Sequence, residues 1–206
     1  MALTTYSDLK TSVANYLGRT DLTTQIPDFI RLAEFRMRRE LRLRSMLKLS
    51  TASMTGGDNT VGLPSNFLAI KDLTIDTNPK RSLNYLSPSA FNRNGRTTES
   101  GLPVFYTTIA NEFRFAPIPD SNYTLEMLYY AAPEFLSDSV SSNVFMANAP
   151  DMLLYGALVE AEPYLMNDAR IQLWAGMYDR ALKSLTESDD GGEYSGVPLS
   201  MTLTAR

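Results

Sequence analysis

The sequence contains neither histidine nor cysteine, and this limits the chemistry that the chain could catalyse. Without these residues there is no imidazole base, no thiolate nucleophile, no disulfide and no zinc site with the usual ligands. The best candidates for a pair of acid–base carboxylates are Glu160, Glu162 and Asp168. Glu160 and Glu162 are two residues apart, so they would point about 200° apart on a helix and could not act together.

Two glycine-rich segments also lack the pattern that their chemistry requires. Gly56–Gly57 is not followed by the lysine and helix start of a phosphate-binding loop. Asp189–Asp190, beside Gly191–Gly192, lacks the alternating ligand positions of a calcium loop. We therefore predict no catalytic, cofactor-binding or metal-binding residues and a protein that is not an enzyme. A carboxylate-dependent hydrolase remains an alternative, which the missing carboxylate pair disfavours.

Charge is concentrated in one segment, residues 31–48. It carries a net charge of +5, although the whole chain has a net charge of -4, so the remaining residues sum to -9. Its seven basic residues are Arg31, Arg36, Arg38, Arg39, Arg42, Arg44 and Lys48. A concentration of this kind is typical of a surface that meets an acidic partner or phosphates.

Three interpretations of this segment are open. It could be a protein interface, for which we predict Arg31, Arg38, Arg39 and Arg42 as the positive contact face. It could be a solvated helix face, since Glu34–Arg38 and Glu40–Arg44 have the spacing of stabilising pairs along a helix. It could also contact nucleic acid, although the sequence pI near 4.9 argues against nucleic-acid binding by the whole protein.

Length and composition favour a small folded protein. The 206 residues are 44% apolar, which is enough for one domain or for one domain with a smaller inserted unit. The longest apolar stretch, Met152–Val159, is far shorter than the roughly 20 residues that span a bilayer. The first residues show no secretory signal. We therefore expect a soluble protein without a membrane partner that is made in the cytoplasm, and the lack of cysteine fits a reducing compartment.

The predicted elements place helices at both ends and strands in the middle. A helix should follow the Thr5 and Asp8 capping pair and end at Gly18, and a second should run from about Pro27 to Arg44. Near the C-terminus a helix should start at Pro150, kink at Pro163, and precede a last helix over about 168–186. Strands are predicted over the ranges 49–54, 60–63, 67–75, 82–86, 104–110, 112–117 and 123–130, and a short helix over 88–92.

This order predicts an α+β fold. The N- and C-terminal helices would form a helical bundle, with a small antiparallel β unit inserted between them and an extended C-terminal tail. We expect N-terminal helices over 1–46, the β-rich unit over 47–148, C-terminal helices over 149–187 and a flexible extension over 188–206. Trp174 and Tyr178 should hold the two pairs of helices together.

The C-terminal extension has two different halves. Its first half, SDDGGEYSG, has the composition of a flexible linker. In the second half Val197, Leu199, Met201 and Leu203 alternate strictly with other residues, as in a strand. No hairpin partner lies beside this segment in the sequence. We therefore predict a docking segment that becomes ordered only on assembly, by adding a strand to a neighbouring protein.

Three blocks of sequence resemble one known family. They are FIRLAEFRMRRELRLRSM, GLPVFYTTIANEFRFAPIPDSNYTLEMLYYAAPEFL and DMLLYGALVEAEPYLMNDARIQLWAGMYDRALKSL. In order and composition they resemble the bacteriophage portal-associated adaptor proteins, also called head–tail connector or head-completion proteins. The similarity covers roughly residues 1–187 and does not include the tail.

This resemblance implies a virion structural protein without catalytic residues or cofactors. Such subunits form a ring, commonly of twelve copies, beneath the portal of a tailed phage, in the neck between head and tail. The implied partners are other copies of the chain, the portal protein, tail or nozzle proteins and passing double-stranded DNA, bound without sequence specificity. An alternative function is a DNA-binding regulatory protein that uses the basic helix at Arg31–Lys48.

Overall fold

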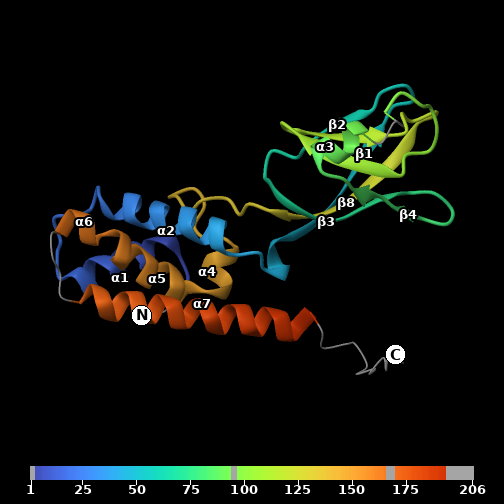
Figure 1. Cartoon of the computed structure of the whole chain (residues 1–206). Coiled ribbons are helices and arrows are strands. Elements are labelled where there is room, and N and C mark those ends of the chain that lie inside the picture. The colour runs from blue at the N-terminus through green and yellow to red at the C-terminus, as the bar shows by residue number, and fades with distance from the viewer. Residues whose placement is uncertain (1–2, 94–96, 166–169, 194–206) are drawn as a thin grey trace, which may run out of the picture. The chain divides into compact units, whose positions relative to one another are not determined.

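The computed structural model describes residues 3–93, 97–165 and 170–193, which fold into two compact units (Figure 1). A helical unit takes its residues from 1–45 and 133–206, and a β unit consists of residues 46–132. The predicted α+β class is confirmed, because helices from both ends of the chain enclose a stretch of strands in the sequence. The predicted β-rich range ended at residue 148, whereas residues 133–148 lie in the helical unit.

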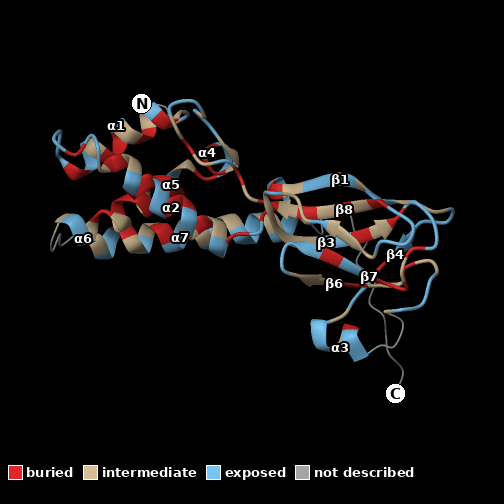
Figure 2. Ribbon diagram, turned by 90° about the horizontal axis from the view of Figure 1, so that it is seen from above, coloured by how far each residue is buried: buried red, intermediate tan, exposed pale blue. Residues whose placement is uncertain are grey.

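The helical unit is built around one buried helix, α5 (Pro150–Glu160). It contacts α1 (Tyr6–Leu17), α2 (Ile26–Glu40), α4 (Val144–Asn148), α6 (Glu162–Leu165) and α7 (Ile171–Glu193). Figure 2 shows that much of α5 is buried. Met152, Leu153 and Leu158 are completely buried. A helix that is apolar nearly all round is expected to be surrounded by protein. As predicted, the helix breaks beside Pro163, between α5 and α6.

The ends of α1 follow the local sequence signals. The Thr5 hydroxyl accepts a hydrogen bond from the Asp8 backbone N–H at 3.2 Å, and the Asp8 carboxylate accepts one from the Thr5 backbone N–H at 3.0 Å. Gly18 ends the helix in the left-handed conformation with φ of 68°. These contacts satisfy backbone groups that a helix terminus otherwise leaves without partners.

Replacing Thr5 with alanine should therefore lower the free energy of unfolding by about 1 kcal/mol, because the Asp8 N–H loses its acceptor. Chemical denaturation of purified protein measures the change. Thr11→Ala, in the same helix, is the control, since the exposed Thr11 hydroxyl donates only to the Ser7 carbonyl in the helix body. Equal losses in the two variants would contradict the capping role of Thr5.

Two helix ends differ from their predicted positions. α2 ends at Glu40, because Leu41 has extended backbone angles, so Arg42 and Arg44 do not continue the helix. The predicted helical pair Glu40–Arg44 is therefore wrong. α7 begins at Ile171 and continues to Glu193, so the first residues of the predicted flexible extension, 188–193, are helical. Asp189 explains part of this extension, since its carboxylate accepts hydrogen bonds from the backbone N–H of Arg44 at 3.0 and 3.2 Å.

The β unit consists of two four-stranded sheets. The first has the order β1 (Leu47–Met54), β8 (Tyr123–Ala131), β3 (Phe67–Ile75) and β4 (Arg81–Ser82). The second has the order β2 (Thr60–Gly62), β7 (Glu112–Ala116), β6 (Phe105–Ile109) and β5 (Asn84–Tyr85). All pairs are antiparallel except β5 with β6.

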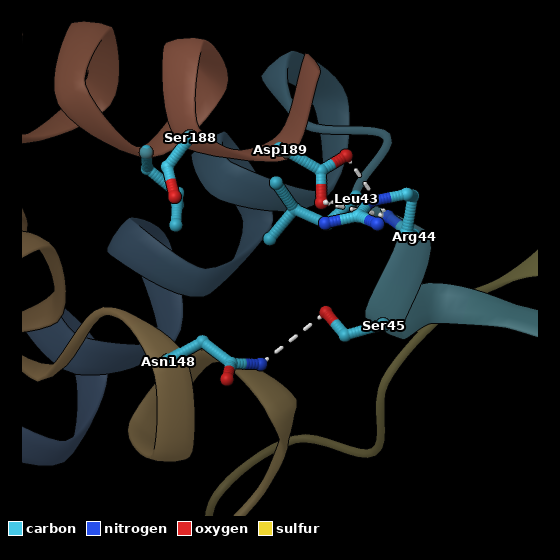
Figure 3. Close-up of a pocket in the computed structure, with 7 residues that line it drawn as sticks. Leu43, Arg44, Ser45, Asn148, Ser188 and Asp189 are labelled. Carbon is cyan, nitrogen blue, oxygen red and sulfur yellow. Dashed lines mark hydrogen bonds and ion pairs between the residues drawn. The ribbon is translucent and has the colours of Figure 1, made fainter. Parts of the chain in front are cut away.

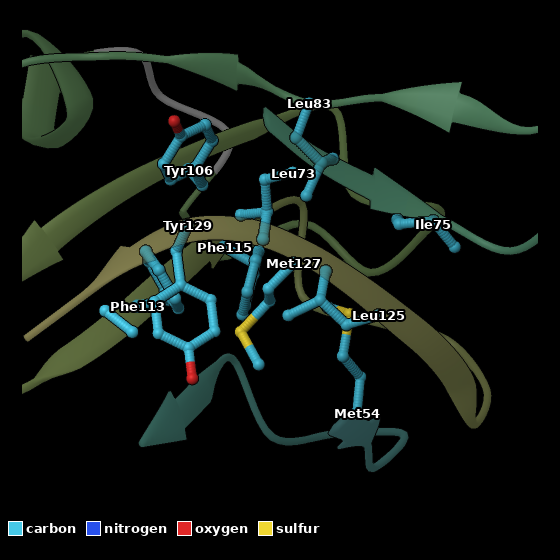
Figure 4. Packing of buried hydrophobic residues seen from close by; sticks show 11 residues of the cluster. Met54, Leu73, Ile75, Leu83, Tyr106, Phe113, Phe115, Leu125, Met127 and Tyr129 are labelled. Atoms are coloured by element: carbon cyan, nitrogen blue, oxygen red, sulfur yellow. The ribbon is translucent and has the colours of Figure 1, made fainter. Parts of the chain in front are cut away.

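One apolar core fills the β unit (Figure 4). Phe113 and Phe115 from β7 and Leu125 from β8 are completely buried in it. Phe113 contacts the rings of Tyr106 and Phe67 edge-on, with centroids 5.8 Å apart in both pairs. The alternating residues of β8 supply this core, as their sequence pattern predicted.

Most predicted strands correspond to observed ones, but the single strand predicted over 82–86 is wrong, because this stretch forms β4 and β5, which belong to different sheets. β6 and β7 form a hairpin in which Ile109 pairs with Glu112, so Ala110, predicted to end a strand, is a turn residue together with Asn111. Ala110 has φ of 56°, in the left-handed region that a tight turn requires. The predicted short helix is present as α3 (Pro88–Arg93). Across the described ranges, no helix is long and apolar enough to cross a membrane.

Candidate subunit interface

An exposed cluster of arginine and phenylalanine side chains lies on the outer side of α2. Its members are Arg31, Phe35 and Arg38 from α2 and Phe135 from the segment that follows the β unit, and we refer to these four residues as the Arg–Phe patch. The rings of Phe35 and Phe135 lie 4.6 Å apart between centroids. Phe35 is 45% exposed, and its neighbour Leu32 is 47% exposed. Apolar side chains of this size gathered on one surface are typical of a contact site.

Phe135 lies between the two arginines of the patch. The Arg31 Cζ is 3.5 Å and the Arg38 Cζ 3.3 Å from the centroid of the Phe135 ring. Two guanidinium groups cannot share one face of a ring at these distances, so they occupy opposite faces. Cation–π contacts of this kind fix the orientation of the arginines while leaving their charge available to a partner.

The other two predicted contact arginines lie beside the patch. Arg39 is exposed at the end of α2. Arg42 is exposed too, and its Nη1 donates hydrogen bonds to the carbonyls of Arg38 at 2.8 Å and Leu41 at 2.6 Å. Arg42 therefore satisfies carbonyls at the helix C-terminus, where a positive charge is also favoured by the helix dipole. Arg31, Arg38 and Arg39 thus belong to α2, whereas Arg42 follows its C-terminus and contacts the Arg38 carbonyl.

A buried carboxylate, Glu34, anchors the segment that carries Phe135. Glu34 is 1% exposed, and it accepts hydrogen bonds from the Leu136 backbone N–H at 3.0 Å and the Asn143 Nδ2 at 2.7 Å. Arg38 donates a hydrogen bond to the carbonyl of Pro133 in the same segment. Burial raises the pKa of the Glu34 carboxyl, while those hydrogen bonds and the charge of Arg38 oppose the rise. Glu34 therefore has the role of a structural acceptor and does not form the predicted surface pair.

Arg36 points in another direction, toward α5 and α7. Its Nε is 3.0 Å from Glu40 Oε1, and its Cζ is 4.3 Å from the centroid of the Tyr178 ring. The Tyr178 hydroxyl donates to Glu40 Oε2 at 2.6 Å, and burial together with this hydrogen bond raises the pKa of the hydroxyl. Tyr178 and Trp174 are 0% and 4% exposed, and the contacts of Tyr178 with Arg36 and Glu40 join α7 to α2, as predicted for Tyr178.

A pocket of about 290 Å³ lies between the end of α7 and the segment after α2 (Figure 3). Arg44 Nε is 3.4 Å from Asp189 Oδ1, and Asn148 Nδ2 donates to Ser45 Oγ at 3.2 Å. These contacts fix the exit of α2 to α7 and α4. Among the described residues, no group of three or more acidic side chains is placed to hold a metal ion.

Phe135 lies against both Arg31 and Arg38, and Arg42 donates to the Arg38 carbonyl, so three of the four predicted arginines lie together. Their role in an interface stays a prediction, as does the second predicted element. Val197, Leu199, Met201 and Leu203 lie outside the described residues. Sequence reasoning missed Phe35 and Phe135, although a phenylalanine one turn from Arg31 on a helix is a signal that could have indicated a mixed surface. It had no means of finding Phe135, which is about 100 residues away in the chain and comes close only in the fold.

An α+β chain with a mixed cationic and aromatic contact surface is typical of a protein whose function is interaction. The comparisons with known proteins specify the class further. The sequence matches the SU10 adaptor protein family over residues 4–202, and the chain therefore belongs to that family of phage structural adaptors. A comparison with curated proteins found no match.

Proposed function

We propose that the chain is a subunit of a ring in the neck of a tailed phage, where it joins the portal at the head to the tail. The match to the SU10 adaptor family over almost the whole chain carries this proposal. The ring, of twelve copies by its resemblance to portal-associated adaptors, would extend the channel through which double-stranded DNA passes without sequence-specific contacts. Its partners would be the portal protein on one side and tail or nozzle proteins on the other.

The proposed function needs no catalysis, but it needs contact faces on each subunit. A closed ring of identical subunits joined head to tail requires two different complementary faces on each copy. We assign the Arg–Phe patch with Arg39 and Arg42 to one of these faces, because it combines exposed aromatic surface with positive charge. The remainder of the chain outside residues 31–48 has a net charge of -9 and offers the complementary sign.

The alternative, a DNA-binding regulator, receives less support from the same residues. Several cations of the basic segment are engaged within the chain, because Arg36 pairs with Glu40 and Arg44 with Asp189. Arg38 is partly buried against Phe135. Phosphate recognition would use arginines that project freely toward the DNA. A DNA mobility-shift assay at low salt should therefore show no discrete complex.

Reversing the charge of Arg39 and Arg42 should weaken association between copies about ten-fold or more, because like charges would then meet across the interface. Arg38 is less suitable for this charge reversal, since it also holds Pro133 and Phe135 in place. Mass photometry and negative-stain electron microscopy of Arg39→Glu/Arg42→Glu, alone and with the portal protein, measure ring formation.

A control with the same change in net charge is available on α7. Arg180→Glu/Lys183→Glu alters two exposed cations, and only a surface pair between Lys183 and Glu187 is lost with them. This control should assemble like the wild-type protein. Normal assembly of Arg39→Glu/Arg42→Glu would show that the interface is elsewhere. Absence of rings and of portal binding in the wild-type protein would overturn the proposed function itself.

A further inference from the structure

One sheet of the β unit ends in a long strand with an open edge. β1 pairs with β8 along all eight of its residues, Leu47–Met54, and it is the terminal strand of its sheet. The other terminal strands are short: β4 and β5 have two residues each, and β2 has three. A long open edge presents unpaired N–H and C=O groups to any strand that approaches, and proteins usually keep such edges short or covered.

The outer face of the sheet makes this edge apolar as well. Leu47 lies opposite Tyr130 and Leu49 opposite Leu128, so these four side chains form two rows that run to the open edge of β1. Both rows end at β1, because no further described strand follows it in the sheet. Leu49 is 67% exposed, more than any other large apolar side chain in the part of the chain that the structure describes. An added strand with apolar residues on this face would continue both rows by one position.

The chain itself contains a segment of matching length and pattern. Thirteen residues follow Glu193, and within them Val197, Leu199, Met201 and Leu203 would share one face of a strand. Pro198, Ser200 and Thr202 would occupy the opposite face, and Pro198, which has no N–H, fits an added edge strand only where that position faces away from β1. The seven residues 197–203 are almost as long as the eight-residue β1.

We propose that β1 accepts residues 197–203 of a second copy of the chain as an additional strand, with their apolar side chains beside Leu47 and Leu49. This inference deepens the proposed function, because it rests on copies being held next to one another. Each copy has one long open edge among its described strands and one tail, so head-to-tail exchange around a closed ring would pair every such edge with one tail. Main-chain hydrogen bonds would supply affinity, and the alternating apolar side chains of residues 197–203 would set the register.

The absence of native cysteine makes the proposal directly testable by disulfide trapping. One full-length population carries Thr51→Cys, on the same face of β1 as Leu49, and a second carries Leu199→Cys, Met201→Cys or Leu203→Cys. After mixing and oxidation, disulfide-linked heterodimers should form with at least one of these three variants. Thr202→Cys is the matched control, since its side chain would point away from Thr51 and neighbouring Cβ atoms must lie about 4 Å apart to form a disulfide.

A second pair of variants tests the apolar contact. Adding Leu49→Glu to the Thr51→Cys chain should lower the initial rate of heterodimer formation about ten-fold. A charge would then replace the leucine side chain that the added strand would bury. Leu173→Glu is the control, since Leu173 is 59% exposed but belongs to α7 in the other unit. This variant should form heterodimers at the rate of the parent chain.

The outcomes separate this inference from the proposed function. Heterodimer yields no higher than with Thr202→Cys, in preparations that form rings, would overturn the strand addition and leave the ring proposal intact. A disulfide formed within single molecules of a Thr51→Cys/Met201→Cys double variant would also overturn it, because the occupant would then be the chain's own tail. Heterodimers without rings, even in the presence of portal protein, would support the strand addition and overturn the proposed ring.

Discussion

Replacing Gly156 with valine should lower the free energy of unfolding of the helical unit by about 3 kcal/mol, because there is no room for a side chain at this position. Gly156 lies in α5 and faces Ala33 of α2 and Tyr178 of α7. A Cβ added there would be 3.1 Å from the Cβ of Ala33 and 3.3 Å from Cε2 of Tyr178. Valine would place two further methyl groups against Ala33 and Tyr178, which are completely buried, so α2 and α7 would have to move apart.

The matched control for this substitution is Gly176→Val in α7. A Cβ added at Gly176 meets nothing within 4 Å, so valine should be tolerated or should stabilise the helix by a few tenths of a kcal/mol. Denaturant unfolding followed by circular dichroism compares the two variants. Equal stability of Gly156→Val and Gly176→Val would contradict the packing of α5 between α2 and α7.

Replacing Glu34 with alanine should lower the free energy of unfolding by a similar amount, about 3 kcal/mol. The Leu136 N–H and the Asn143 side chain would lose the acceptor on which they converge. The segment that carries Phe135 would then be released from α2, and the Arg–Phe patch would lose one of its two rings. We therefore expect reduced assembly of this variant even at temperatures where it remains folded. Glu187→Ala, at an exposed position with one weak surface pair, should change stability little.

The pH dependence of the Glu34 site follows from the direction of its pKa shift. Burial raises the pKa of this carboxyl above its ordinary value of 4.5, so the folded state favours the protonated form. The associated stabilisation is fully present below that ordinary value and is lost as the pH rises through the raised value. Glutamine cannot titrate, so the advantage of wild-type protein over Glu34→Gln should decrease as the pH rises. Unfolding curves measured from pH 4 to 8 give this difference, and an advantage that grows with pH would contradict a buried Glu34.

Local signals in the sequence were sufficient to predict most elements. The ends of α1 are encoded by Thr5, Asp8 and Gly18, which act on backbone groups only a few residues away. β8 was predictable because its alternating side chains match the two faces of a half-buried strand. In both cases the deciding interactions lie within the segment itself, or they depend only on which of its faces is apolar.

The features that the sequence did not reveal depend on contacts between distant residues. α7 continues through Ser188–Gly192, against its local composition, and Asp189 in this stretch is bound by Arg44. Glu34 has ideal spacing for a pair with Arg38, but the fold brings Leu136 and Asn143 within its reach instead. The charge pattern indicated the arginines of the candidate site, of which Arg31 and Arg38 meet at Phe135, but it did not indicate the aromatic half that Phe135 completes.

The helical unit thus holds the proposed contact surface on a rigid framework. Gly156 permits close packing of three helices, and Glu34 fixes the segment that carries Phe135 against α2. An interface of this kind is formed before a partner arrives, so association does not have to include the cost of ordering it. This rigidity suits a subunit that repeats the same contact around a ring.

The position of the chain in the phage particle tests the central claim most directly. Purified virions that carry an epitope tag on this chain can be labelled with a gold-conjugated antibody and imaged by cryo-electron microscopy. We expect the label at the neck, in a ring of density between head and tail. Label inside the head or along the tail, or virions that lack the chain altogether, would contradict the assignment.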